Sequence, residues 1–504
     1  MVAETAGVSP FELDGEPAPA GKIDEIVFAR LKRLGIRPAR PCSDAVFVRR
    51  ASLDITGTMP TAAEARAYLA DKSPTKRRDL VERLLQREEY ADYWAMRWCD
   101  ALRVKSEFPI NLWPNAVQAY HRWVRACLRD NMPYDRFARE LLTASGSNFR
   151  VPPVNFYRAL QGRGPAPVAK TVALTLMGAR IERWPAARRR GMEAFFSRIA
   201  YKPTGEWKEE IVQYDPSKGP LTGAVLPDGT KAVVADGRDP REVFAAWLTA
   251  PGNPWFARAA VNRVWAWMFG RGIVHEPDDL RPDNPPSNHE LLTYLERGFV
   301  ASGYDLRRLV RQIALSSTYQ LSCVPRSHAP DAEAQFAFYP LRRLDAEVLI
   351  DAINQITGTT ESYSSAIPEP FTFIPERSRS IALADGSITS AFLEVFGRPA
   401  RDTGMFAERS NRATAAQRLH LLNSSHIRNK IERGPALFAI TRSARSDREA
   451  TEALYLTILS RFPTDQERAA VGEHLTKAGR LGRGSALNDV AWALLNSSEF
   501  LYRH

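Results

Sequence analysis

The chain has 504 residues, of which 44% are hydrophobic and 25% charged, and this globular composition excludes a disordered or collagen-like protein. Lysine and arginine number 69 against 58 acidic residues, so the formal net charge of +11 favours polyanionic partners. Four cysteines without paired spacing exclude a disulfide scaffold and a zinc ribbon. No apolar run approaches the ~20 residues of a membrane span, and the first residues show no export signal.

Helical patterns dominate the first 200 residues. Residues 1–22 are rich in Gly, Pro, Ala and Glu and predict a flexible N-terminal tail. Residues 23–205 predict a helical domain, in which Ser43 precedes an apolar run as a helix cap. Thr61 and Glu64 have the spacing of a capping box, which predicts another helix start.

The pattern changes between the two halves of the chain. Short β-branched runs flank a Pro-Asp-Gly turn within 206–237, which predicts a β-rich connector with a hairpin at about 210–236. Helical periodicity resumes over 238–504 and is interrupted by a loop-rich insertion at 358–390. The expected fold is therefore mainly α, with two helical bodies joined by a short β-hairpin insertion.

A proline-rich loop carries the first candidate chemistry. His275, Asp278 and Asp279 lie there with Glu276 and Asp283, which places four carboxylates and an imidazole within nine residues. Such a group can supply an acid/base pair or, as a less favoured reading, an oxygen-rich divalent metal site. A solvated acidic loop that caps the next helix is the alternative.

A second polar cluster is expected on one helix near the C-terminal third of the chain. Gln417, His420 and Asn423 recur every three residues and fall close to one face, with His426 a further three residues on. Glu408 and Arg409 lie just upstream. These groups could line a cleft, with His420 and Glu408 as catalytic candidates and Arg409, Gln417 and Asn423 as ligand-binding candidates; a hydrogen-bond network between helices is the alternative.

Two further patterns predict an ion-pair network and an aromatic surface. Buried arginines need carboxylate partners, and the predicted network comprises Asn262, Arg263, Arg342, Arg343, Asp345 and Glu347, with Asp345 or Glu347 as partner of Arg263. Aromatic rings beside cations suit sugar rings and bases, and the ligand-binding candidates of this kind are Trp98, Trp113, Trp123 and Arg122. Burial of these rings in the core is the alternative.

Several segments resemble one family pair. They include Phe47–Thr61, Tyr90–Arg103 and Asn131–Gly146 in the first half, and Trp247–Trp265, Gly270–Asp279, Arg342–Glu347, Phe396–Pro399 and Gln417–Asn423 in the second. In this order they resemble two domains of unknown function, PSCyt and PSD, of planctomycete and verrucomicrobial cytochrome-associated proteins. The resemblance covers about 23–200 and 238–504.

The chain departs from this family pattern at two places. Relatives usually carry Cys-x-x-Cys-His, the haem c attachment motif, where this chain has Gly178–Phe196 without cysteine or histidine. Met405–Ala407 stands where many relatives have Cys-x-Cys. We therefore expect no covalent haem at the family site, and no cofactor.

The resemblance implies a bacterial envelope setting, periplasmic or extracellular, beside exported alkaline-phosphatase-like proteins; a cytoplasmic location stays open. The first functional expectation is a non-redox binding or assembly component that interacts with an anionic polymer, such as a sulfated polysaccharide, or with such a partner protein. A polysaccharide hydrolase or lyase using Asp278, Asp279, His275 and His420 is the alternative. Nucleic-acid binding is a third hypothesis, which suits the charge but lacks a recognised module.

Overall fold

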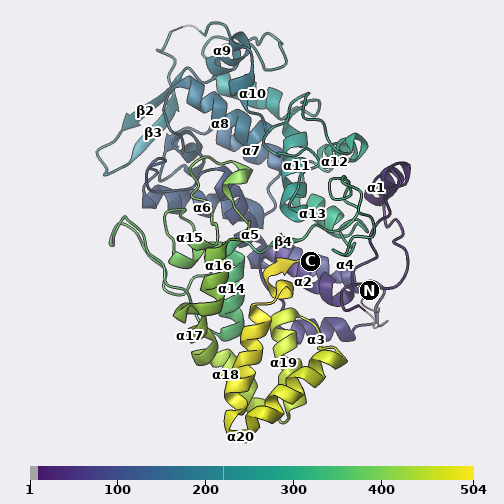
Figure 1. Ribbon diagram of the computed structural model, residues 1–504. Coiled ribbons are helices and arrows are strands. Elements are labelled where there is room, and N and C mark those ends of the chain that lie inside the picture. Colours follow the sequence, from purple (N-terminus) through teal and green to yellow (C-terminus); the bar gives the residue numbers. More distant parts are fainter. Residues whose placement is uncertain (1–8, 220) are drawn as a thin grey trace.

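The computed structural model describes residues 9–219 and 221–504, and within them helices predominate, as predicted (Figure 1). The N-terminal half holds α1 (Lys22–Arg33), α2 (Asp44–Thr56), α3 (Ala62–Ala70), α4 (Lys76–Leu85), α5 (Glu88–Ala101), α6 (Pro114–Arg129), α7 (Tyr134–Thr143), α8 (Pro165–Met177) and α9 (Ala186–Ala194). The predicted caps are present: the Ser43 hydroxyl accepts a hydrogen bond from the amide of Val46, and Thr61 and Glu64 form a capping box.

The C-terminal half contributes α10 (Pro240–Leu248), α11 (Phe256–Phe269), α12 (His289–Ala301), α13 (Leu306–Ala314), α14 (Ala346–Thr357), α15 (Ala391–Val395), α16 (Ala415–Asn423), α17 (Ser425–Arg433), α18 (Pro435–Ser443), α19 (Asp447–Leu459), α20 (Asp465–Leu495) and α21 (Ser498–Leu501). The helical run of α20 is interrupted at Gly479, whose φ of 63° departs from helical geometry. Helices α14 and α16–α20 gather at one end of the molecule, and α8–α10 at the other (Figure 1).

The strands are short. Antiparallel β2 (Ile199–Pro203) and β3 (Glu210–Tyr214) form a hairpin, and β1 (Gly146–Ser147) adds to the free edge of β3. The hairpin expected at 210–236 is therefore wrong in its pairing: the partner of 210–214 lies upstream, because Ile199 and Val212 are both buried when β2 pairs with β3. Val225 and Lys231 make one isolated bridge around the predicted turn.

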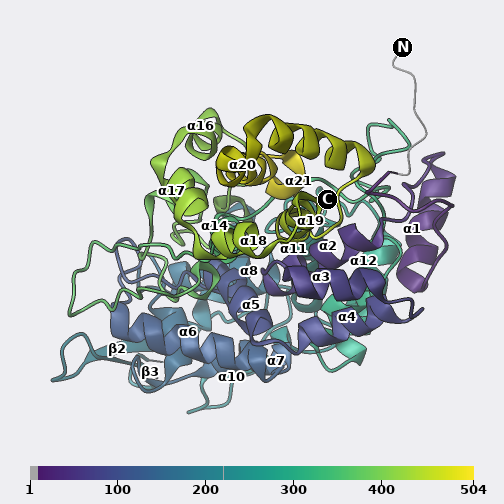
Figure 2. The same cartoon turned by 90° about the horizontal axis from the view of Figure 1, so that it is seen from below.

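One continuous hydrophobic core spans both halves of the chain. Trp94 and Trp98 of α5 contact Trp267 of α11, with ring centroids 5.8 and 5.1 Å apart. Strands β4 (Arg342–Arg343) and β5 (Tyr502–Arg503) pair antiparallel between the two ends of the molecule. The two helical bodies expected from the sequence thus share their interior, and α5 lies between them (Figure 2).

The segment before α1 lies against the body. Residues 1–8 of the expected tail fall outside the described part of the chain, but Phe11 packs edge-on against His504 at 5.6 Å, and Ser43 donates to the carbonyl of Pro10. From residue 9 onward the expected flexible tail is therefore held by specific contacts. Over the residues described, no helix combines the length and apolar character needed to cross a membrane.

Candidate functional site

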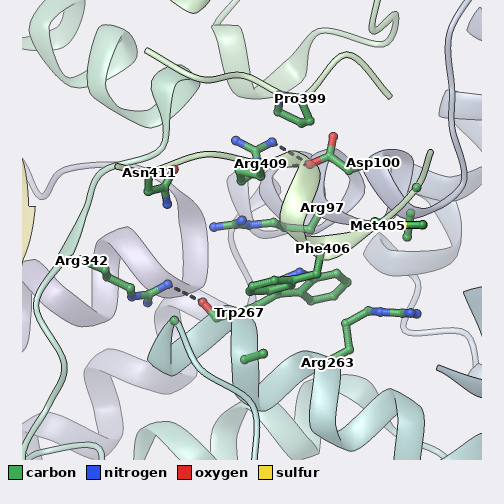
Figure 3. A pocket seen from close by; sticks show the side chains of 14 residues that line it. Arg97, Asp100, Arg263, Trp267, Arg342, Pro399, Met405, Phe406, Arg409 and Asn411 are labelled. Atoms are coloured by element: carbon green, nitrogen blue, oxygen red, sulfur yellow. Dashed lines mark hydrogen bonds and ion pairs between the residues drawn. The ribbon is translucent and has the colours of Figure 1, made fainter. Parts of the chain in front are cut away.

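A small cavity of about 190 Å³ lies where the two halves of the chain meet (Figure 3). Its walls come from α5, the C-terminal end of α11, β4 and the loop that follows α15. The polar lining residues are Arg97, Asp100, Arg263, Arg342, Arg409 and Asn411, and Trp267, Met405 and Phe406 supply the larger apolar surfaces. Four of these side chains are arginines and one is a carboxylate. Each of the four arginines is paired with at least one buried or half-buried carboxylate.

A glycine and a carboxylate shape the loop on the rim of the cavity. The Glu408 carboxylate accepts hydrogen bonds from the backbone amides of Asp402, Thr403 and Gly404, at 2.7, 3.1 and 3.2 Å. Gly404 has a φ of 72°, and a Cβ there would lie 2.7 Å from the carbonyl oxygen of Ala101. Only glycine fits this close approach to α5 without strain.

Arg409 is the most heavily paired arginine of the cavity. Its guanidinium binds the Glu347 carboxylate at 2.6 and 3.0 Å and the Asp100 carboxylate at 2.6 Å. Burial lowers the pKa of Arg409, but Asp100 and Glu347 outweigh this effect and raise the pKa well above its ordinary value. Arg409 is therefore a permanent cation that fixes the position of both carboxylates.

Arg97 is less completely paired. Its Nη2 donates to the Tyr93 hydroxyl at 2.8 Å and to the Asp345 carboxylate at 2.5 Å. The Nε of Arg97 is buried and makes no hydrogen bond within the described residues. The side-chain oxygen of Asn411 is likewise buried and accepts no hydrogen bond from them. A buried N–H without an acceptor is costly, so Arg97 is less fully satisfied than Arg409.

Arg263 and Arg342 anchor the opposite wall. Arg263 donates to the carbonyls of Thr175 and Leu174 at 2.5 and 3.0 Å and to Asp278 at 2.9 Å. Arg342 donates to the carbonyl of Trp267 at 2.6 Å and pairs with a buried aspartate of α2. Both guanidinium groups are held by backbone carbonyls at helix ends, where the partial negative charge favours a cation.

Positive charge exceeds negative charge in the network around the cavity. Within the described residues, the five carboxylates are Asp54, Asp100, Asp278, Asp345 and Glu347, and the seven arginines paired with them are Arg97, Arg263, Arg342, Arg398, Arg401, Arg409 and Arg503. The network therefore carries two positive charges more than its carboxylates neutralise.

Two carboxylates of the network, Asp345 and Glu347, are held in their ionised form by neighbouring arginines. Burial raises the pKa of Asp345, but Arg97, Arg503 and Arg409 overcome this effect and hold the pKa well below its ordinary value. Burial likewise raises the pKa of Glu347, and Arg409 and Arg398 bring it below the ordinary value. Asp345 and Glu347 therefore each contribute a negative charge to the network at neutral pH.

Two protein-family models match the chain. Residues 22–175 match PSCyt2 and residues 240–475 match PSD1, each described as a protein of unknown function (DUF1549 and DUF1553). The chain therefore carries a PSCyt2 domain followed by a PSD1 domain. No curated protein and no solved structure matches it. The cavity lies between the two matched regions, since α5 belongs to the PSCyt2 match and α11, β4 and the rim loop to the PSD1 match.

The acidic loop of the PSD1 region contacts the rim of the cavity but does not line it. Asp278 accepts hydrogen bonds from Arg263 and, at 2.5 Å, from the backbone amide of Phe406. Asp279 pairs with Arg281 at 3.2 Å. His275 is half-buried, which lowers its pKa. Asp278 and Asp279 are therefore engaged in ion pairs. No group of three or more metal-ligating side chains occurs in the described residues.

The histidine cluster lies elsewhere. The single helix expected for positions 417–426 is wrong, because Ser424 caps a new helix through its hydroxyl and divides the segment into α16 and α17. His420 Nε2 lies 3.2 Å from His426 Nδ1, and His426 Nε2 lies 3.0 Å from Glu361, beside a separate cavity of about 830 Å³. Burial and the neighbouring His426 lower the pKa of His420.

The remaining polar candidates of this segment divide between the core and the surface. Gln417 is buried and accepts a hydrogen bond from Arg343, while its amide donates to the carbonyl of Val395 at 2.9 Å. Asn423 is exposed at the end of α16. Arg409 alone among these ligand-binding candidates lines the arginine cavity.

The predicted ion-pair network exists, with different partners. Arg263 pairs with Asp278 rather than with Asp345 or Glu347, because the 275–283 loop folds back against α11. Asp345 and Glu347 instead hold Arg409. The side chain of Asn262 bonds both backbone polar groups of Val274, at 2.9 Å each, and so fixes the base of the same loop.

The aromatic candidates also divide between the core and the surface. Trp98 is 1% exposed and packs against Tyr134 and Trp267, so its assignment as a ligand-binding residue is wrong: α5 is buried on nearly all sides. Trp123 stacks on Phe137 with ring centroids 4.9 Å apart. Arg122 is exposed on α6. Trp113 lies at the surface in a group of aromatic rings described below.

The two places where the chain departs from the family pattern meet beside the arginine cavity. Ile181 and Glu182, from the stretch without the haem motif, line a neighbouring cavity of about 560 Å³ together with Met405. Met405 lines both cavities, so the rim loop separates them. The sequence did not single out Arg97 and Asp100 as lining residues. The signal for them is that both fall in the second half of α5, among buried residues.

Proposed function

We propose that the protein is a non-redox binding component that recognises an anionic group, such as the sulfate ester or carboxylate of an acidic polysaccharide, in the arginine cavity. The observation that carries this proposal is the excess of two buried positive charges in the network of seven arginines and five carboxylates.

An excess of buried positive charge favours the binding of an anion. Buried charges without a counter-charge are costly, and natural proteins pair them or use them to bind ions. Guanidinium groups donate to carboxylate, sulfate and phosphate oxygens in bidentate geometry. A sulfate ester or carboxylate in the cavity would lie beside Arg97 and Arg409 and offset one of the two excess positive charges. The volume of about 190 Å³ suits one such group, with the rest of a polymer outside.

The cavity supports binding better than hydrolysis. Cleavage of a glycosidic bond by the common mechanisms needs two carboxyl groups on either side of the bond. Asp100 is the carboxylate on the lining, and its two oxygens accept from Arg401 and Arg409 at 2.9 and 2.6 Å. A polysaccharide hydrolase or lyase built on Asp278 and His420 is accordingly the weaker proposal.

Calorimetric titration of the full chain tests the proposal. The probes are inorganic sulfate, glucose 6-sulfate, glucuronate and uncharged glucose, and we expect the charged probes to bind and glucose not to bind. Arg97→Met should abolish this binding, whereas Arg122→Met, at an exposed arginine of α6, should leave it intact. Absence of binding by every charged probe, or equal binding by Arg97→Met, would contradict the proposal.

A further inference from the structure

Three aromatic side chains from three separate loops meet on the surface, away from the arginine cavity. Trp113 precedes α6, Trp207 lies in the turn between β2 and β3, and Phe371 belongs to the loop-rich insertion of the PSD1 region. The ring of Trp113 lies 6.3 Å from that of Trp207 at an angle of 81°, and 5.7 Å from that of Phe371 at 58°. We call these three residues the aromatic platform.

The platform is open to solvent. Trp207 is 69% exposed and Phe371 is 51% exposed, so neither ring is explained by burial in the core. The β2–β3 hairpin and the loop-rich insertion both extend outward on one side of the molecule, beside α6 (Figure 2). Large exposed aromatic groups gathered in this way mark interaction sites.

A cation completes the platform. The ammonium group of Lys208 lies 5.1 Å from the ring centroid of Trp113 and 5.2 Å from that of Trp207. Within residues 9–219 and 221–504, Lys208 makes no ion pair. The two indoles therefore hold a positive charge over one face of each ring and leave the other ring faces to a ligand.

The backbone at Trp113 is strained to maintain this arrangement. Trp113 has φ 72° and ψ 144°, a region that side chains other than glycine rarely adopt. Such conformations cost roughly 1–3 kcal/mol each and concentrate at functional sites. The strain places the Trp113 ring between the hairpin and the insertion, where it bridges Trp207 and Phe371.

We propose that the aromatic platform is a carbohydrate-binding surface on which the pyranose rings of an acidic polysaccharide stack, with Lys208 paired to an anionic substituent. Indole faces carry negative charge that attracts the C–H bonds of a sugar ring, and their rigid area binds at little entropic cost. Only the anionic character of the polymer rests on the proposed function; the stacking surface stands on its own geometry.

The flanking charges favour a polysaccharide over a lipid surface. Trp207 is preceded by the exposed carboxylate of Glu206 and followed by Lys208. Burial of these charges in an apolar membrane would be costly, whereas a hydrated polysaccharide leaves them in water. A membrane is accordingly the competing outcome of the test.

Affinity electrophoresis of the full chain in gels containing dextran sulfate, carboxymethyl cellulose or neutral hydroxyethyl cellulose tests the proposal. Migration of the protein should be retarded in at least one of the three gels. Trp207→Ala should weaken the affinity derived from this retardation roughly tenfold, as expected for one lost stacking contact. Trp492→Ala is the matched control, because Trp492 is an exposed tryptophan of α20, far from the platform in the chain.

The outcomes separate the two proposals. Lys208→Glu should weaken retardation by the two acidic polymers only, with Lys202→Glu on β2 as its charge-matched control. Hydroxyethyl cellulose carries no charge, so retardation in that gel reports on the stacking surface and would persist even if the arginine cavity bound no anion. Lack of retardation in all three gels, equal retardation of Trp207→Ala, or Trp207-dependent binding to phosphatidylcholine–phosphatidylglycerol vesicles instead would overturn the platform proposal.

Discussion

Arg263 of α11 donates to Asp278 at 2.9 Å, and the second oxygen of Asp278 accepts from the backbone amide of Phe406. One buried carboxylate thus joins a helix, the acidic loop and the rim of the arginine cavity. Asp278, which the sequence suggested as a member of a catalytic pair, instead holds the wall of the cavity in place. This relationship ties the stability of the protein to the geometry of its candidate site.

Asp278→Asn should destabilise the protein by about 3 kcal/mol or more, because removal of one partner leaves the guanidinium of Arg263 buried without its counter-charge. Urea unfolding followed by circular dichroism measures the change. Asp283→Asn is the control, since Asp283 is exposed in the same loop, and its effect should stay within about 0.5 kcal/mol. Equal unfolding midpoints for Asp278→Asn and the wild type would refute this role.

Arg97→Met should leave the ligand-free protein as stable as the wild type. Methionine fills similar volume, Asp345 keeps Arg503 and Arg409 as partners, and one of the two excess positive charges disappears. In thermal unfolding with sulfate in hundred-fold excess over its Kd, the wild type should gain about 2.7 kcal/mol and the variant nothing. If the variant without sulfate unfolds at a temperature far below that of the wild type, Arg97 serves only to stabilise the fold.

Gly404→Ala should weaken anion binding and lower stability by about 1–3 kcal/mol, because alanine is strained at φ 72° and its Cβ would approach the carbonyl of Ala101. Gly298→Ala, in the middle of α12 where a Cβ meets no neighbour, should instead stabilise the protein by about 0.5–1 kcal/mol. Calorimetric titration and urea unfolding measure the two effects. Full binding by Gly404→Ala would mean that the rim loop does not shape the cavity.

The protein should lose stability on acidification below pH 6.5. Burial lowers the pKa of His121 to about 3, whereas an unfolded histidine has a pKa of about 6.5. Below pH 6.5 the unfolded chain therefore binds a proton that the native state excludes, and the stabilisation present above pH 6.5 falls by about 2 kcal/mol at pH 5.

His121→Gln removes this contribution, so the drop in unfolding free energy between pH 7 and pH 5 should be smaller by about 2 kcal/mol than in the wild type. His289→Gln, at an exposed histidine of α12, should keep the full drop. Urea unfolding at the two pH values gives the comparison. An identical drop in all three proteins would show that His121 is protonated in the native state.

Local signals in the sequence predict the helices well, and tertiary pairing is where the prediction fails. Ser43 and Thr61 cap helices as expected, since capping depends on neighbours within four residues. The buried character of Arg263 was also predictable from its apolar helix. Its partner was not, because the choice between Asp278 and Asp345 depends on how a loop folds back against α11.

The candidate sites likewise depend on tertiary contacts that local sequence signals do not reveal. Trp113 could be proposed as a ligand-binding residue from aromatic spacing, but its companions Trp207 and Phe371 come from distant loops that meet only in the folded chain. Trp98 follows the same spacing yet is buried, because both faces of α5 pack against other helices. The excess of arginine in the cavity network likewise becomes visible only when the ion pairs are assembled.

Binding of an anion in the arginine cavity can be observed in an anomalous difference map from crystals soaked in selenate, a sulfate analogue. We expect an anomalous peak within hydrogen-bond distance of Arg97 and Arg409 in the wild type, and no peak there in Arg97→Met. Selenate bound at surface arginines with none in the cavity, at concentrations that saturate the calorimetric signal, would contradict the claim.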